Sequence, residues 1–163
     1  MYYHTEGRTG DFYVQMKKHN FDYLEENLRV HYRIIGNGDM NIVFIPGLSQ
    51  GVNNFRMQYE FFKENARSIY IDLPGHGLSD APMSYMEWDE SQPEPVLLKS
   101  GFQYNFAVMA DAIYTVVKKE KMDNFVVVGH SLGAKVLGEF ERKYPSMMTK
   151  MINLDGLFHP WFG

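Results

Sequence analysis

The order of apolar and polar residues divides most of the chain into alternating strands and helices. Four mainly apolar stretches predict buried strands at residues 41–45, 68–73, 125–128 and 151–154. Between them, apolar residues recur at the three- and four-residue spacing of one helix face. These predicted helices contain Phe55, Tyr59 and Phe62; Phe102, Phe106, Met109, Ala110, Ile113 and Val117; and Val136, Leu137 and Phe140. Strands that alternate with helices predict an α/β fold with a mostly parallel, twisted sheet flanked by helices.

The N-terminal part of the chain shows a different pattern. Residues 28–35 alternate between apolar and polar side chains, as a half-buried antiparallel strand does. The alternation places three residues on the polar side, Arg29, His31 and Arg33. Residues 21–25 are predicted to pair with this strand, and residues 11–18 are predicted to form another short strand. Residues 1–10 are polar with two glycines and are expected to be a loose arm.

Residues 81–99 contain Pro, Glu and Met without any periodicity, so we expect an excursion over the surface. No internal repeat or linker interrupts the chain. Its 163 residues therefore predict one domain, spanning 1–163, with a core of its own.

Composition narrows the class of protein. Hydrophobic residues make up 45% of the chain and aromatic residues 15%, which predicts a globular protein. A net charge of −4 without a long basic run argues against nucleic acid or an anionic membrane as the main partner. The absence of Cys excludes disulfides and thiolate chemistry. No apolar run approaches the length of a membrane span and the N-terminus has no apolar signal segment, so a soluble, cytoplasmic protein is expected.

The candidate chemistry lies between the strand at 125–128 and the helix that follows it. Gly129, Ser131 and Gly133 form the pattern G-x-S-x-G, which is typical of a nucleophile elbow when a strand precedes it and a helix follows. Such a turn directs the Ser hydroxyl away from the strand end, and glycines let the strand and helix approach closely. The helix N-terminus also supplies free N–H groups where an oxyanion would form. The alternative is an ordinary Gly-rich strand-to-helix turn.

Two other loops are expected beside this turn, because ligand sites in α/β sheets lie beyond the carboxyl ends of the strands. They are Pro46-Gly47-Leu48-Ser49 and the loop that follows Asp72-Leu73, Pro74-Gly75-His76-Gly77-Leu78-Ser79. The order of strand–Pro-Gly, D-x-P-G-x-G-x-S and G-x-S-x-G resembles the α/β-hydrolase superfamily. The resemblance covers roughly residues 20 to 156.

The resemblance implies roles for particular residues. Ser131 matches the nucleophile, and the backbone N–H groups of Leu132 and Leu48 match the two donors of the oxyanion hole. His76 and His130 occupy positions that usually serve loop packing. The remaining two polar residues at this edge, Asp72 and Ser79, are expected to stabilise their loop.

The superfamily also places an acid after a seventh strand and a His after an eighth, in the order Ser, acid, His. This chain ends after what we count as the sixth strand, so it is expected to lack the usual C-terminal strands and the cap. Asp155 and His159 are the two residues that could substitute as acid and base. The competing interpretation is that Asp155 caps a loop and His159 begins a missing cap. We favour it because so short a spacing leaves little room for a triad.

Two classes of function follow. The first is a serine hydrolase that acts on a carboxylic ester or related acyl substrate through Ser131, with no cofactor or metal. The second is a non-catalytic protein that keeps the fold as a binding or interaction module. A full triad in a longer parent sequence would favour the first, and loss of all fluorophosphonate labelling would favour the second.

The end of the chain suggests a further property. Residues 151–154 would be an edge strand, and edge strands present unpaired backbone groups. Four large apolar residues follow it, Leu157, Phe158, Trp161 and Phe162. We therefore expect self-association through residues 150–163. The alternatives are that this surface meets the missing part of a longer parent, or that Trp161 and Phe162 fold back over the edge.

Overall fold

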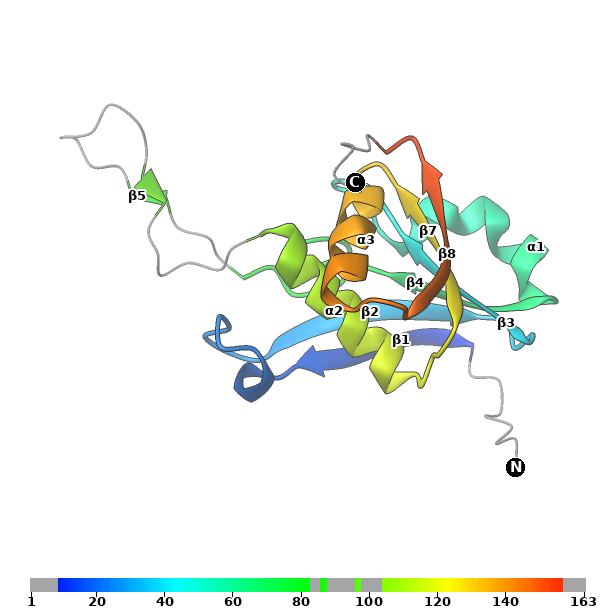
Figure 1. Ribbon diagram of the computed structural model, residues 1–163, viewed down its shortest axis with the longest axis horizontal. Helices are drawn as coiled ribbons and strands as arrows, with labels where there is room; N and C mark the ends of the chain where they lie inside the picture. The colour runs from blue at the N-terminus through cyan, green and yellow to red at the C-terminus, as the bar shows by residue number, and fades with distance from the viewer. Residues whose placement is uncertain (1–8, 83–85, 88–95, 98–103, 157–163) are drawn as a thin grey trace.

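One six-stranded sheet, in the order β1-β2-β4-β3-β7-β8, organises the molecule (Figure 1). The computed structural model describes residues 9–82, 86–87, 96–97 and 104–156. Neighbours pair in parallel from β4 through β3 and β7 to β8, whereas β1 and β2 pair antiparallel, as do β2 and β4. The strands span Gly10–Met16 (β1), Leu28–Ile35 (β2), Met40–Ile45 (β3), Ala66–Ile71 (β4), Phe125–His130 (β7) and Met148–Leu154 (β8). The predicted α/β fold with a mostly parallel sheet is therefore confirmed.

Helices cover both faces of the sheet. The two long helices lie side by side on one face, α2 (Phe106–Lys119) and α3 (Leu132–Lys143) (Figure 1). The other face packs against η2 (Val52–Gln58) and α1 (Tyr59–Lys63). Two shorter features complete the described chain: the 3-10 turn η1 (Lys18–Asn20) and the antiparallel pair β5 (Met86–Glu87) and β6 (Val96–Leu97).

Alternation along β3 divides the core between these two faces. Val43 and Ile45 are buried in the cluster that contains α2 and α3, while Ile42 and Phe44 are buried in the cluster under η2. Successive side chains of a strand point to opposite faces, so a strand that is apolar at every position must be covered on both. The continuous apolar pattern of residues 41–45 has this cause.

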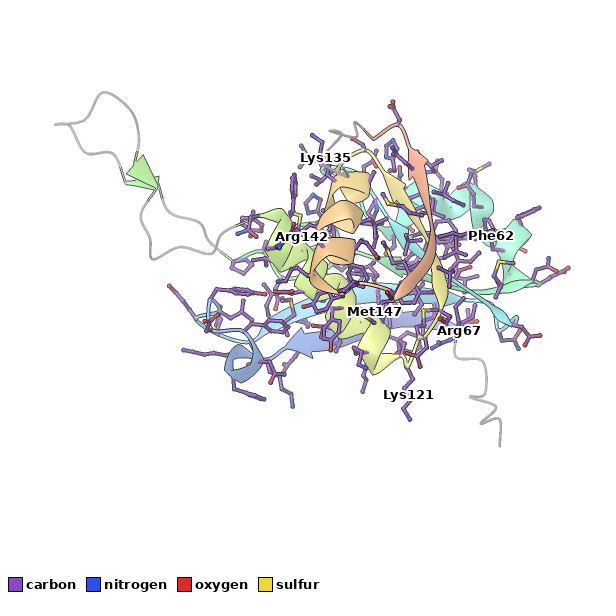
Figure 2. The ribbon with its side chains drawn as sticks, viewed as in Figure 1. Phe62, Arg67, Lys121, Lys135, Arg142 and Met147 are labelled. Carbon is purple, nitrogen blue, oxygen red and sulfur yellow. The ribbon has the colours of Figure 1, made fainter. Side chains whose placement is uncertain are left out.

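The two later predicted helices are present as α2 and α3, although Phe106, which was expected on the buried face of α2, is 42% exposed. The first predicted helix is instead a 3-10 segment, η2, followed by the five-residue α1, and only Phe55 of its three predicted apolar residues is buried. The side chain of Asn105 accepts a hydrogen bond from the Val108 N–H at 3.0 Å and thereby caps α2. Phe102, which we placed in this helix, lies outside the described residues. On α3 the predicted apolar residues Val136, Leu137 and Phe140 are buried, while Lys135 and Arg142, labelled in Figure 2, are exposed.

The N-terminal predictions need three corrections. Residues 21–25 form no strand; they turn, with the Leu24 N–H bonded to the Phe21 carbonyl at 3.0 Å. The partners of β2 are β1 and β4 instead. His31 is fully buried rather than on a polar face. Of the predicted loose arm, only Thr9 and Gly10 are described, and Gly10 already begins β1.

The C-terminal strand lies at the edge of the sheet, as predicted, although it begins at Met148 rather than at residue 151. Most of the predicted surface excursion, residues 81–99, lies outside the described residues. None of the helices in the described part of the chain has the length and apolar character needed to cross a membrane.

Candidate active site

Ser131 occupies the turn between β7 and α3 with a positive φ of 49° and a ψ of −110°, outside the regions that non-glycine residues usually adopt. A non-glycine residue adopts positive φ only at a cost, which the surrounding structure must offset. Here the Ser131 N–H donates to the Leu154 carbonyl at 2.9 Å, and the Ser131 carbonyl accepts from the Ala134 N–H at 3.1 Å. The strand on one side and the helix on the other therefore fix the turn.

Two glycines allow the close contacts that the turn requires. A Cβ on Gly129 would lie 2.7 Å from the Ala134 backbone nitrogen, so a side chain there would push α3 away from β7. A Cβ on Gly133 would lie 2.3 Å from the Ile45 carbonyl oxygen, at the end of β3. The glycines thus bring the start of α3 against both neighbouring strands.

The loop after β3 lies directly beside Ser131. A Cβ on Gly47 would be 3.4 Å from Ser131 Cβ. Leu48 follows with a side chain that is 68% exposed, and the loop then turns back through a bond from the Gln50 N–H to the Gly47 carbonyl at 3.2 Å. On the other side, Leu132 is the first residue of α3, and helix geometry leaves the first amides without an intrahelical acceptor. Both expected oxyanion donors therefore belong to backbone segments that adjoin Ser131.

His130 is held by the same loop. Gln50 Oε1 accepts the Gly47 N–H at 3.0 Å and lies 2.9 Å from His130 Nδ1. Because this oxygen is an acceptor, His130 Nδ1 must carry the proton of the second bond. The imidazole therefore ties the elbow to the loop, which agrees with the loop-packing role that we expected. Gln50 was not singled out in the sequence, because no motif marks it and its partner is distant in the chain.

Asp72, in the loop after β4, is buried, and its carboxylate accepts two backbone N–H groups from different loops. Oδ1 accepts from Val52 at 2.7 Å, and Oδ2 accepts from Leu78 at 2.9 Å. The Ser79 hydroxyl donates to the Asp72 carbonyl at 2.7 Å, and His76 Nδ1 lies 3.0 Å from the Pro74 carbonyl. Asp72, Ser79 and His76 thus bond to the backbone of the loops at this edge of the sheet, as the loop-packing roles expected for them require.

Asp155 follows β8 and has a left-handed backbone, with φ 54°. Its side chain is exposed, and its neighbour Leu154 is the residue that accepts the Ser131 N–H. The turn is closed by Asn153, whose amide bonds Gly156 in both directions at 2.8 Å. The structure thus brings the Asp155 backbone near the elbow. His159 lies outside the described residues.

Among the described residues, no three His, Asp or Glu side chains come together as a metal site. The groups that surround Ser131 are backbone amides, an amide side chain and an imidazole. Backbone amides and helix N-termini of this kind can stabilise negative charge on an oxygen atom.

Comparison with known proteins gives a consistent result. A family model described as "alpha/beta hydrolase fold" matches residues 41–163. Epoxide hydrolase 1 of Caenorhabditis elegans is 27% identical over 141 residues, which cover 86% of this chain and 29% of that protein. A serine hydrolase-like protein of Danio rerio is 26% identical over 70% of this chain and 30% of its own length. The chain spans less than a third of either relative.

Solved structures show the same fold. A thermophilic esterase from Thermogutta terrifontis superposes with a TM-score of 0.70, at 18% identity, over 91% of this chain and 47% of that chain. An esterase from Exiguobacterium antarcticum gives a TM-score of 0.63, at 23% identity, over 77% of this chain and 41% of that chain. At these identities the likeness concerns the fold.

Proposed function

Because this chain belongs to the α/β-hydrolase family, we propose that it is a serine hydrolase that cleaves a carboxylic ester or related acyl compound. The observation that carries this proposal is the conformation of Ser131. Ser131 has a positive φ at the N-cap of α3, and its Cβ lies beside Gly47, the residue that precedes Leu48. A nucleophile that is surrounded by backbone donors suits attack on a carbonyl carbon.

The proposed reaction has two steps. Ser131 Oγ attacks the carbonyl carbon, and the carbonyl oxygen becomes an oxyanion that accepts hydrogen bonds from the Leu48 and Leu132 N–H groups. The alcohol then leaves with the proton that the Ser hydroxyl gave up, and water hydrolyses the acyl-enzyme in the second step. His130 and His76 are engaged in the loop contacts described above.

A second candidate is a non-catalytic binding or interaction module. It is favoured by one observation: no hydrogen bond joins Ser131 Oγ to a basic side chain in the described part of the chain. Reaction with an activated fluorophosphonate separates the two candidates, because the first requires covalent modification of Ser131 and the second predicts none.

Asp155 and His159 can be tested as a substitute acid and base. We expect Asp155→Asn and His159→Ala each to change the rate of phosphonate labelling by no more than about twofold, because we do not expect the pair to act as a catalytic unit. The double variant should combine the two changes independently. If the pair were part of a triad, each single variant would lose most of the rate and the double variant little more. The labelling rates of the two single variants and the double variant are measured by quenching the reaction at set times and determining the modified fraction by intact-mass spectrometry.

We also propose that the edge of β8 mediates self-association. Ile152 and Leu154 are 47% and 42% exposed, and β8 has a neighbour on one side only among the described strands. Ile152→Lys places a charge at this edge and should weaken association by about tenfold in sedimentation at micromolar concentration. Met57→Lys is the matched control, because Met57 is an exposed apolar residue (79%) on η2. Equal association in both variants and the unmodified chain would contradict the proposal.

A further inference from the structure

His31 makes hydrogen bonds from both ring nitrogens although its side chain is completely buried. Nδ1 lies 2.7 Å from Asp72 Oδ2, and Nε2 lies 3.2 Å from Asp11 Oδ1. The backbone of the same residue is bonded as well: its N–H donates to Ser79 Oγ at 2.8 Å, and its carbonyl accepts from the Asp72 N–H at 3.0 Å. One residue of β2 thus contacts β1 and the loop that follows β4.

The hydrogen bond from His31 to Asp72 matters most for the site, because the Asp72 carboxylate also binds two loops. Its carboxylate lies between the loop after β3, where it accepts the Val52 N–H, and the loop after β4, where it accepts the Leu78 N–H. A Cβ on Gly51 would lie 2.8 Å from Asp72 Oδ1, so the loop after β3 packs directly on this carboxylate. A rotation of the carboxylate would release both loops together.

The far side of the imidazole is fixed by a second charged pair. Arg33 donates to both oxygens of Asp11, from Nε at 2.7 Å and from Nη2 at 3.0 Å. The Arg33 guanidinium lowers the pKa of Asp11, which keeps that carboxyl an acceptor toward His31. Arg33 Nη1 also donates to Asn53 Oδ1 at 2.7 Å, just beyond the loop after β3. The ring of His31 is therefore oriented from both ends.

We propose that His31 is a positioning residue for the oxyanion hole: by orienting the Asp72 carboxylate, it fixes the loop that carries Leu48 beside Ser131. The role assigned to Leu48 rests on the proposed function. The orientation of the loop by His31 and Asp72 does not, so the two can be tested separately. A small displacement of an oxyanion donor is enough to slow the chemical step strongly.

Three substitutions separate the hydrogen bonds of His31 from its packing. In His31→Asn, the amide nitrogen replaces Nδ1, so the donor to Asp72 is kept and the contact with Asp11 is lost. In His31→Gln, the amide nitrogen replaces Nε2, so the donor to Asp11 is kept and the one to Asp72 is lost. His31→Leu removes both. Gln fills more of the space of the imidazole than Asn does, so a role in packing alone predicts that Gln is the better replacement.

The first measurement is amide hydrogen exchange at Val52 and Leu78, with the Val127 amide in β7 as the reference for global stability. We expect protection of Val52 and Leu78, relative to Val127, to fall about tenfold in the Gln and Leu variants and to stay within about threefold of the unmodified chain in the Asn variant. If Gln retained protection as well as Asn or better, the inference would be overturned. Equal protection in all variants would overturn it too.

The second measurement is the kinetics of phosphonate labelling of Ser131. The maximal labelling rate should fall about tenfold in the Gln and Leu variants, while the half-saturating probe concentration stays the same, because a displaced oxyanion donor affects the transition state rather than binding. The Asn variant should recover most of the rate. If the unmodified chain does not label at all, the proposed function fails, and the exchange measurement still decides the role of His31.

Discussion

Replacement of Ser131 by alanine is expected to abolish covalent labelling by an activated fluorophosphonate. The hydroxyl oxygen is the only side-chain atom of Ser131 that can form the ester bond to phosphorus, and alanine lacks it. Where hydrolysis of an activated ester is measurable, the same variant should lower the rate by at least about a thousandfold, the usual effect of removing a serine nucleophile. Intact-mass spectrometry after incubation with the probe gives the first result, and a continuous ester assay gives the second.

Ser146→Ala is the matched control for this experiment. Ser146 is an exposed serine beyond the C-terminal end of α3, and it also has a positive φ, of 66°. It should label like the unmodified chain. Labelling that persists in Ser131→Ala would show that the probe reacts elsewhere and that the elbow is not the nucleophilic site. Folding of the variant is checked by its urea midpoint, because loss of one hydroxyl at a turn should leave it nearly unchanged.

The strand–turn–helix unit that contains Ser131 could be predicted from sequence because its determinants are local. Gly129, Ser131 and Gly133 lie within one turn, and the apolar strand before them and the amphipathic helix after them identify its context. The loop with Gly47 was expected nearby on a general rule, that the carboxyl ends of parallel strands share an edge of the sheet. The structure places Gly47 and Ser131 side by side, as this rule requires.

His31 could not be predicted in the same way. Alternation along a strand assigns polar residues to the exposed face, and His31 occupies a polar position of that pattern. It is buried because its partners Asp72 and Asp11 lie 41 and 20 residues away in the chain and satisfy both ring nitrogens. Gln50 escaped notice for the same reason, since its partner His130 is 80 residues away. A single sequence gives no signal for such long-range pairs.

The strand predicted at residues 21–25 was wrong for a related reason. Aromatic residues at Phe21 and Tyr23 favour a strand locally. The edge of β2 is already occupied by β1, which pairs with it from Gly10 to Met16, and the connection between them must reverse direction. Tyr23 instead donates its hydroxyl proton to Asp111 at 2.6 Å, on α2. Tertiary partners decided the conformation of this segment over its local preference.

The substitution Gly133→Ala is expected to be the most destabilising change at the elbow. The added Cβ would lie 2.3 Å from the Ile45 carbonyl oxygen and 2.8 Å from that of Pro46, and both neighbours are backbone atoms that cannot rotate away. Overpacking of this kind costs about 3 kcal/mol, which in a protein of this size lowers the melting temperature by about 6–12 °C. Urea and thermal unfolding followed by circular dichroism measure the loss directly.

Gly138→Ala, on the same helix, is the control and is not expected to destabilise the protein. Gly138 is half-buried within α3, where alanine is favoured over glycine by about 1 kcal/mol, so this variant should be at least as stable as the unmodified chain.

The two glycine variants should also differ in the rate at which Ser131 is labelled. To accommodate a methyl group at residue 133, the end of β3 must move away from α3, and the loop that begins at Pro46 must move with it. Gly133→Ala should therefore label more slowly at Ser131 even under conditions where it is fully folded, whereas Gly138→Ala should label at the normal rate. If Gly133→Ala is as stable and as reactive as Gly138→Ala, the close approach of α3 to β3 is not what holds the proposed oxyanion loop beside the nucleophile.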